Sequence, residues 1–222
     1  MNKIDAEEGA AIATRVLAAI LDVTPTKGRP GADLRTAIGD FTIGALELIQ
    51  YDRAGPRLDA IFDLTRKNGA SLPDLAYVRS IAVDQDPDTP GGSLIRNSLI
   101  NLSLATEARI VADTEFKSRN AAIALKDQMN EAFDAMEEIA ADSMDTFTYR
   151  ALIALHAAVT EHLITAQYPL PVMLAFRFAA PGPTLVQAYR LYDDASRADE
   201  ILENNGVVHP LFALPVGVAL SE

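Results

Sequence analysis

One stretch of this chain fits a β-strand better than any other: Val172-Met173-Leu174-Ala175-Phe176-Arg177-Phe178. Its large apolar side chains recur at every second position, namely Val172, Leu174, Phe176 and Phe178. A period of two places them on one face of a strand. Most other apolar residues of the chain recur with helical spacing. The sequence therefore predicts a mainly α protein with a small C-terminal sheet.

The residues after this strand predict a small α+β unit. Residues 180–183 are rich in Pro and Gly and turn the chain, and residues 185–192 carry apolar side chains at helical spacing. Ser196 and Asp199 have the spacing of a capping box for a second short helix, which Asn205-Gly206 can end. The last segment alternates again at Val216, Val218 and Leu220, so we expect it to pair with the first strand.

A helical body precedes this unit. Apolar residues at helical spacing predict helices over residues 5–22, 32–53, 55–69, 71–83 and 93–111. Ser71 and Asp74 have the spacing of a capping box at the start of the fourth. Residues 84–92 are acidic and contain two prolines, which indicates a solvated loop.

A long helical hairpin is predicted between the body and the α+β unit. Residues 112–141 predict one helix whose apolar seam repeats at spacings of four and three: Leu125, Met129, Ala132, Met136 and Ile139. Asp145 can cap a second helix from Thr146 to about Ala166, joined to the first by a short link through Ser143. We therefore expect three parts: a helical region at 1–110, the hairpin at 111–168, and the α+β domain at 169–222.

The ionisable residues of the hairpin predict no metal site. Its first helix carries carboxylates that we expect to face solvent with no inward histidine beside them: Asp127, Glu131, Asp134, Glu137 and Glu138. In the second helix, His156 and His162 are six residues apart, whereas two helical zinc ligands usually need an i, i+4 spacing. The prediction is packing or surface histidines, with no metal and no cofactor.

Composition excludes several classes of function. The 19 Lys and Arg against 31 Asp and Glu give a net charge of −12, and the basic residues are scattered, so we expect no direct binding of nucleic acid. No stretch reaches the roughly 20 apolar residues of a membrane span. The acidic N-terminal residues predict no signal peptide. Without cysteine there is neither a disulfide nor a thiol nucleophile.

Catalytic motifs are also missing from the sequence. It contains no Gly-x-Ser-x-Gly elbow, no Gly-rich phosphate loop and no His-Glu-x-x-His helix. We therefore expect a protein that is not an enzyme and assign no residue a catalytic role.

Residues 172–222 resemble a LysM module. Four segments carry the resemblance: Gly182-Pro183-Thr184-Leu185, Ala188-Tyr189-Arg190-Leu191-Tyr192, Ile201-Leu202-Glu203-Asn204-Asn205 and Pro215-Val216-Gly217-Val218-Ala219-Leu220. LysM modules have the same order of strand, helix, helix and strand over a similar length. The resemblance implies a LysM-like βααβ unit, and it leaves peptidoglycan as an alternative ligand.

A longer segment is similar to the C-terminal part of the phage Mu-type tail and DNA circulation (circularisation) proteins. The similarity is carried by residues 184–201, by Asn204 and by His209-Pro210, with Thr148-Tyr149-Arg150-Ala151-Leu152 before them. It covers roughly residues 145–222. One departure is Asp193, which stands where that family usually has Gly after the tyrosine.

This similarity implies a structural component of a contractile phage tail, in the baseplate hub near the tube tip. It implies a virion protein assembled in the host cytoplasm that docks onto hub, tube, sheath or wedge proteins. Tail parts are rings, so a homo-oligomeric trimer or hexamer is expected. Two alternatives remain open: a LysM-type module that binds peptidoglycan, and a phage DNA circularisation factor, which the charge of −12 fits poorly.

The residues expected to contact other proteins lie where this similarity is best. They are Tyr189, Tyr192, Asn204, His209, Pro210 and Phe212. Two of them, Tyr192 and Asn204, have a second interpretation, in which they only hold the small unit together.

Overall fold

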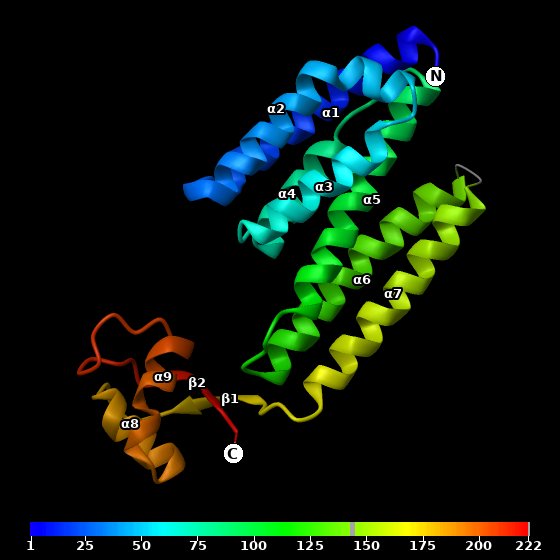
Figure 1. The fold of residues 1–222 in the computed structure, drawn as a ribbon. Coiled ribbons are helices and arrows are strands. Elements are labelled where there is room, and N and C mark those ends of the chain that lie inside the picture. The colour runs from blue at the N-terminus through cyan, green and yellow to red at the C-terminus, as the bar shows by residue number, and fades with distance from the viewer. Residues whose placement is uncertain (143–144, 222) are drawn as a thin grey trace. The chain divides into compact units, whose positions relative to one another are not determined.

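The computed structural model describes residues 1–142 and 145–221, and this part of the chain is mainly helical (Figure 1). Seven helices come first: α1 (Lys3–Val23), α2 (Gly28–Gln50), α3 (Ala54–Lys67), α4 (Leu72–Val83), α5 (Pro90–Ala112), α6 (Arg119–Asp142) and α7 (Thr146–Gln167). The C-terminal elements are β1 (Met173–Arg177), α8 (Thr184–Tyr192), the 3₁₀ helix η1 (Ala195–Arg197), α9 (Ala198–Asn204) and β2 (Val216–Leu220). The prediction of a helical body followed by a small sheet is confirmed.

The chain divides into two compact units. Unit 1 consists of Met1–Thr114 and Asn130–Val159, and unit 2 consists of Glu115–Met129 and Thr160–Glu222. Helices α6 and α7 therefore contribute residues to both units. The three-part division at residues 110 and 168 stays a prediction.

Helices α1 and α5 form the centre of unit 1. The first packs against α2, α4 and α5, and α5 also packs against α3 and α4. Helix α1 buries Val16, Leu17 and Ile20 completely, as its helical spacing predicts. Gly9 permits a close approach of α1 to α5, because a Cβ atom there would lie 2.8 Å from Cγ1 of Ile95.

Glu8 of α1 holds the loop that enters α5. Its carboxylate accepts hydrogen bonds from the backbone N–H groups of Asp88 (2.7 Å) and Thr89 (2.9 Å), and from the Thr89 hydroxyl. The bond from the Thr89 hydroxyl is the main reason that the pKa of Glu8 lies below its usual value. The same hydroxyl accepts from the N–H of Gly92, 3.0 Å away, and so caps α5.

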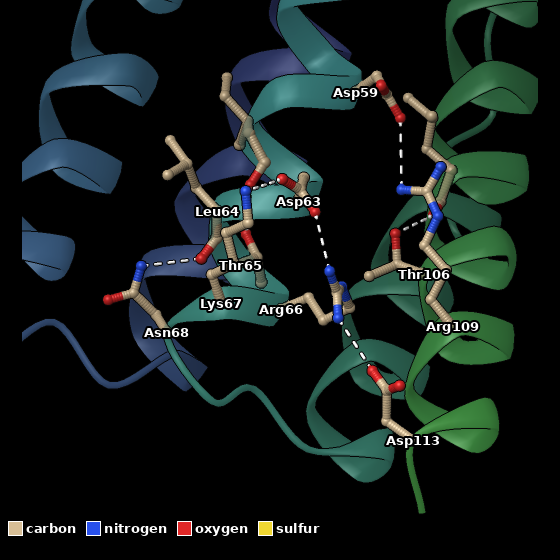
Figure 2. Close-up of polar contacts among 12 residues, drawn as sticks. Asp59, Asp63, Leu64, Thr65, Arg66, Lys67, Asn68, Thr106, Arg109 and Asp113 are labelled. Carbon is tan, nitrogen blue, oxygen red and sulfur yellow. Dashed lines mark hydrogen bonds and ion pairs between the residues drawn. The ribbon is translucent and has the colours of Figure 1, made fainter.

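Ion pairs connect α3 to α5 (Figure 2). Arg109 lies 3.6 Å from Asp59, and Arg66 lies 3.0 Å from Asp113 and 3.3 Å from Asp63. Solvent screens partly exposed pairs of this kind, so each contributes little to the stability of the fold. A more deeply buried pair joins α4 to α5, where Arg79 Nε lies 2.8 Å from Glu107 Oε1.

The capping predictions for the helical body and for the second helix of the hairpin are confirmed. Ser71 and Asp74 form a reciprocal capping box at α4, with the N–H of Ser71 donating to Asp74 Oδ2 at 2.8 Å. Asp145 accepts from the N–H of Thr148 at 3.0 Å, at the start of α7. These bonds satisfy backbone donors that the first turn of each helix leaves free.

The predicted helix over residues 112–141 is wrong at its start. Helix α5 continues to Ala112, and α6 begins only at Arg119. Ser118 accounts for the new start, because its hydroxyl accepts from the N–H of Ala121 at 3.2 Å. The seam of α6 is buried as predicted at Met129, Ala132 and Met136. The expected link through Ser143 lies outside the described residues.

The expectation that no histidine would lie beside the α6 carboxylates is also wrong. His156 of α7 lies against Glu137, with Nδ1 at 2.9 Å from Oε1. The register between two helices depends on their packing, so it could not be predicted from the spacing within either helix. The other carboxylates of this set are exposed, as expected: Asp127, Glu131, Asp134 and Glu138.

Candidate functional site

Unit 2 contains all six residues predicted to contact other proteins. Its sheet pairs β1 with β2 in antiparallel register, from Met173 opposite Leu220 to Arg177 opposite Val216. Against it lies a small core: Ala188, Tyr192, Ala198, Ile201 and Ala219, with Phe176 and Leu191 at its edge. The predicted return of the last segment onto the first strand is confirmed.

One capping prediction in this unit is wrong. Ser196 does not cap α9, because its own N–H and hydroxyl donate to Asp194, both at 2.8 Å. Asp194 thus begins the short helix η1, and α9 follows it directly without a side-chain cap. The predicted end of α9 at Asn205-Gly206 is confirmed, with Gly206 in the left-handed region at φ 58°.

Tyr192 is built into the core of the unit. It is 9% exposed, its hydroxyl donates to Glu200 Oε1 at 2.8 Å, and the Arg197 guanidinium lies 3.6 Å from its ring centre. Burial, reinforced by Glu200, raises the pKa of Tyr192 to about 12. These contacts agree with the interpretation in which Tyr192 holds the unit together.

The two asparagines after α9 differ sharply in their contacts. Asn204 is half-buried, and its Nδ2 atom has no hydrogen-bond partner. Asn205 instead pairs with β2 as a neighbouring strand would: it accepts from the N–H of Val218 at 2.7 Å and donates to its carbonyl at 2.8 Å. The interface role predicted for Asn204 stays a prediction. Asn205, which was predicted only to end the helix, also links it to β2.

The remaining candidates are exposed. His209, Pro210 and Phe212 lie in the segment between α9 and β2, which we call the apolar loop (residues 207–214), and Tyr189 lies on α8 with 59% of its surface exposed. The His209 and Phe212 rings lie 5.3 Å apart, and Phe212 is 74% exposed. The structure thus gathers His209, Pro210 and Phe212 in one loop.

Backbone hydrogen bonds hold the apolar loop against Gly182 and against Thr184, the first residue of α8. The N–H of Thr184 donates to the Pro210 carbonyl at 2.7 Å. Gly182 and Ala213 exchange two backbone bonds, at 3.2 and 3.0 Å. The loop is therefore an ordered part of the unit whose large side chains still face water.

A pocket of about 370 Å³ lies beside the apolar loop, and we call it the loop pocket. Its lining is mostly apolar and includes Phe176, Val208, Phe212, Leu214 and Val216. No Asp, Glu, Lys or Arg lines it.

Gln187 is the buried polar residue of the loop pocket. Its side-chain NH₂ donates to the Leu214 carbonyl at 2.9 Å, while its Oε1 atom is buried without a partner. Burying an amide oxygen without a hydrogen-bond partner is unfavourable, and a donor on a bound ligand would supply the missing hydrogen bond. Nothing in the sequence singles out Gln187, since a single glutamine on a short helix carries no motif.

Comparisons with protein-family models and with curated proteins identify no relative. No protein-family model matches the chain, and no curated protein matches it. Over the residues that the structure describes, none of the helices has the length and apolar character needed to cross a membrane.

Proposed function

We propose that this protein is a non-catalytic structural component of a contractile phage tail, in the baseplate hub near the tube tip. In this proposal it assembles in the host cytoplasm as a ring of identical chains, a trimer or a hexamer. Unit 2 is the part that docks onto neighbouring hub, tube, sheath or wedge proteins.

The apolar loop is the observation that carries the docking proposal. Four of its eight residues are large, apolar and exposed: Val208, Leu211, Phe212 and Leu214. Such residues clustered in one segment are typical of protein–protein contact sites, where their burial supplies most of the binding free energy. Because backbone bonds hold the loop in place, ordering it on binding would cost little conformational entropy.

The character of the loop pocket favours a protein partner over a nucleic acid. Its lining lacks charged side chains, and the centres of protein interfaces are depleted in charge in the same way. A phosphate backbone would need clustered Lys and Arg, which this surface does not offer.

In this proposal unit 2 is a LysM-like docking unit, and the order of its elements supports that assignment. β1, α8, α9 and β2 follow one another as strand, helix, helix and strand, and the two strands pair. The segment most similar to the phage proteins, residues 184–201, forms α8, η1 and the start of α9.

A Phe212→Asp variant tests the docking surface. Phe147, 85% exposed at the start of α7 in unit 1, supplies the matched control Phe147→Asp. Both variants should fold, which circular dichroism checks, since both rings face water. We expect the first to reduce complete tails at least tenfold when it replaces the wild-type gene, and the second to assemble normally. Normal assembly of Phe212→Asp, or equal loss in both variants, contradicts docking through the apolar loop.

A second candidate function is peptidoglycan binding, and the unpaired oxygen of Gln187 is the observation that favours it. The amide and hydroxyl groups of an amino sugar are donors of the kind that this oxygen lacks. A pull-down on purified peptidoglycan tests it, with Gln187→Leu as the variant that should lose retention. If the wild-type chain is not retained, this candidate is excluded.

A further inference from the structure

A second cluster of polar side chains lies in unit 1, between α6 and α7. Asn130, Asp134 and Glu137 come from α6, and His156 comes from α7. Ligand atoms of Asp134, Glu137 and His156 lie within 4.8 Å of one another. The cluster thus joins two carboxylates and an imidazole from two different helices.

The imidazole of His156 is held in a fixed orientation. Its ring stacks on Phe133 with the ring centres 4.8 Å apart and the planes inclined by only 8°. Phe133 is completely buried, and the side chains of Glu137 and His156 are about one-fifth exposed. A ligand that is already oriented in this way loses little entropy when it binds an ion.

The hydrogen bonds of this ring leave room for a cation at one nitrogen. Nε2 lies 3.0 Å from Oδ1 of Asn130, and this contact holds the ring with Nδ1 facing Glu137. Nδ1 lies 2.9 Å from Oε1 of the Glu137 carboxylate. A shared proton or a bound cation can bridge a nitrogen and an oxygen at this distance. Metal-bound histidines show the same arrangement, with the second ring nitrogen donating to a protein oxygen.

We propose that Asp134, Glu137 and His156 bind one divalent cation of the Zn²⁺ type. Zn²⁺ takes imidazole nitrogen and carboxylate oxygen at about 2.0–2.2 Å, which places the ligand atoms of a tetrahedron roughly 3.3 Å apart. The present separations, within 4.8 Å, require only small side-chain rotations to reach that geometry. A fourth position remains for water, and Asn130 orients the imidazole.

The donor set selects among cations. Ca²⁺ and Mg²⁺ prefer six or more oxygen ligands, whereas an imidazole with two carboxylates suits Zn²⁺, Co²⁺ or Ni²⁺. The bound ion would link α6 to α7 and offset the repulsion between Asp134 and Glu137. This inference is independent of the proposed function, because it concerns residues of unit 1 and not the apolar loop.

Calorimetric titration of the metal-free full chain with ZnCl₂ tests the proposal. We expect one equivalent to bind, and His156→Gln, Glu137→Gln and Asp134→Asn each to weaken binding at least tenfold. Two matched controls, His162→Gln on α7 and Glu138→Gln on α6, change exposed neighbours and should bind Zn²⁺ as the wild type does. A millimolar excess of Mg²⁺ should not displace the ion.

The same titration can overturn the proposal. Asp134 is exposed, so Asp134→Asn keeps the fold, and circular dichroism verifies this. Wild-type affinity in that variant, equal loss in the His162→Gln control, or no stoichiometric binding by the wild type each contradicts the site. In ¹⁵N NMR spectra of the imidazole ring, we expect Zn²⁺ to change the chemical shift of Nδ1 of His156. An Nδ1 that stays protonated in excess Zn²⁺ shows that a proton fills this position instead.

Discussion

Asp193 ends α8 in a conformation that an L-residue adopts at a cost. Its φ is 55° and its ψ is 17°, in the left-handed region. The phage family proposed for this segment usually has Gly there, and Gly adopts this region without a steric penalty. The departure noted in the sequence therefore falls on a position where the backbone itself favours glycine.

We expect Asp193→Gly to stabilise unit 2 by about 0.5–1 kcal/mol. The left-handed conformation costs an L-residue roughly 1–2 kcal/mol, and the greater flexibility of unfolded Gly cancels part of the gain. Urea denaturation followed by circular dichroism measures the change. Asp194→Gly is the adjacent control, and it should destabilise the unit because Asp194 accepts from the N–H of Ser196. A less stable Asp193→Gly variant contradicts this reading of the turn.

Tyr192 should make the stability of unit 2 depend on pH in the alkaline range. Its folded pKa is about 12, above the usual value of 10.0, so the neutral hydroxyl is favoured by folding. This contribution is complete below pH 10.0 and is lost as the pH rises toward 12. At about pH 8, Tyr192→Phe should cost roughly 1–2 kcal/mol through the lost hydrogen bond to Glu200.

Denaturation curves of the wild type and Tyr192→Phe, recorded at a series of pH values, measure this difference. The two stabilities should converge above pH 10, while the exposed-residue control Tyr189→Phe follows the wild type throughout. A difference that stays constant up to pH 12 would show that Tyr192 does not titrate as its environment indicates.

Asn205 links two elements, α9 and β2, through side-chain hydrogen bonds. Its side chain satisfies both backbone groups of Val218 on the edge of β2 that faces away from β1. We expect Asn205→Ala to cost about 2–3 kcal/mol, because it leaves two backbone groups without their partner. Asn204→Ala, one residue earlier, removes an amide whose Nδ2 atom has no partner and should change stability by less than about 1 kcal/mol. Equal losses in the two variants contradict the assignment of this role to Asn205.

Capping motifs in the sequence predicted the start of a helix correctly where one side-chain hydrogen bond determines that start. The capping box of Ser71 and Asp74 depends on residues three apart, and it forms as expected. Ser196 and Asp199 have the same spacing, but the N–H and hydroxyl of Ser196 both donate to Asp194 instead of forming a capping box. A capping motif therefore predicts a helix start only when no nearer acceptor is present.

Contacts between elements were beyond prediction. His156 and Glu137 are 19 residues apart, and they meet only because α6 and α7 pack in one register. The side-chain amides of Gln187 and Asn205 donate to the carbonyl groups of Leu214 and Val218, respectively, which are distant in sequence. Of the candidate site, the sequence indicated His209, Pro210 and Phe212 as residues that contact other proteins, but it did not indicate the pocket beside them.

For the whole molecule, the net charge of −12 opposes binding to DNA. Phosphate neutralisation depends on clustered cations, and their absence removes the electrostatic part of the affinity. In a gel-shift assay at about 150 mM salt, we expect no retardation of duplex DNA at roughly 10 µM protein. A saturable shift that weakens as salt rises would favour the DNA circularisation alternative and contradict the proposed docking role.

The central claim is that this chain is a stoichiometric part of a phage tail. Quantitative mass spectrometry of nuclease-treated particles, purified from the host that carries the gene, tests it most directly, with separated tails and heads measured side by side. The account predicts that the chain is present in the tail fraction in a copy number near a multiple of three, as a trimer or hexamer requires. Its absence from particles, or its presence only in the head fraction, would contradict the account.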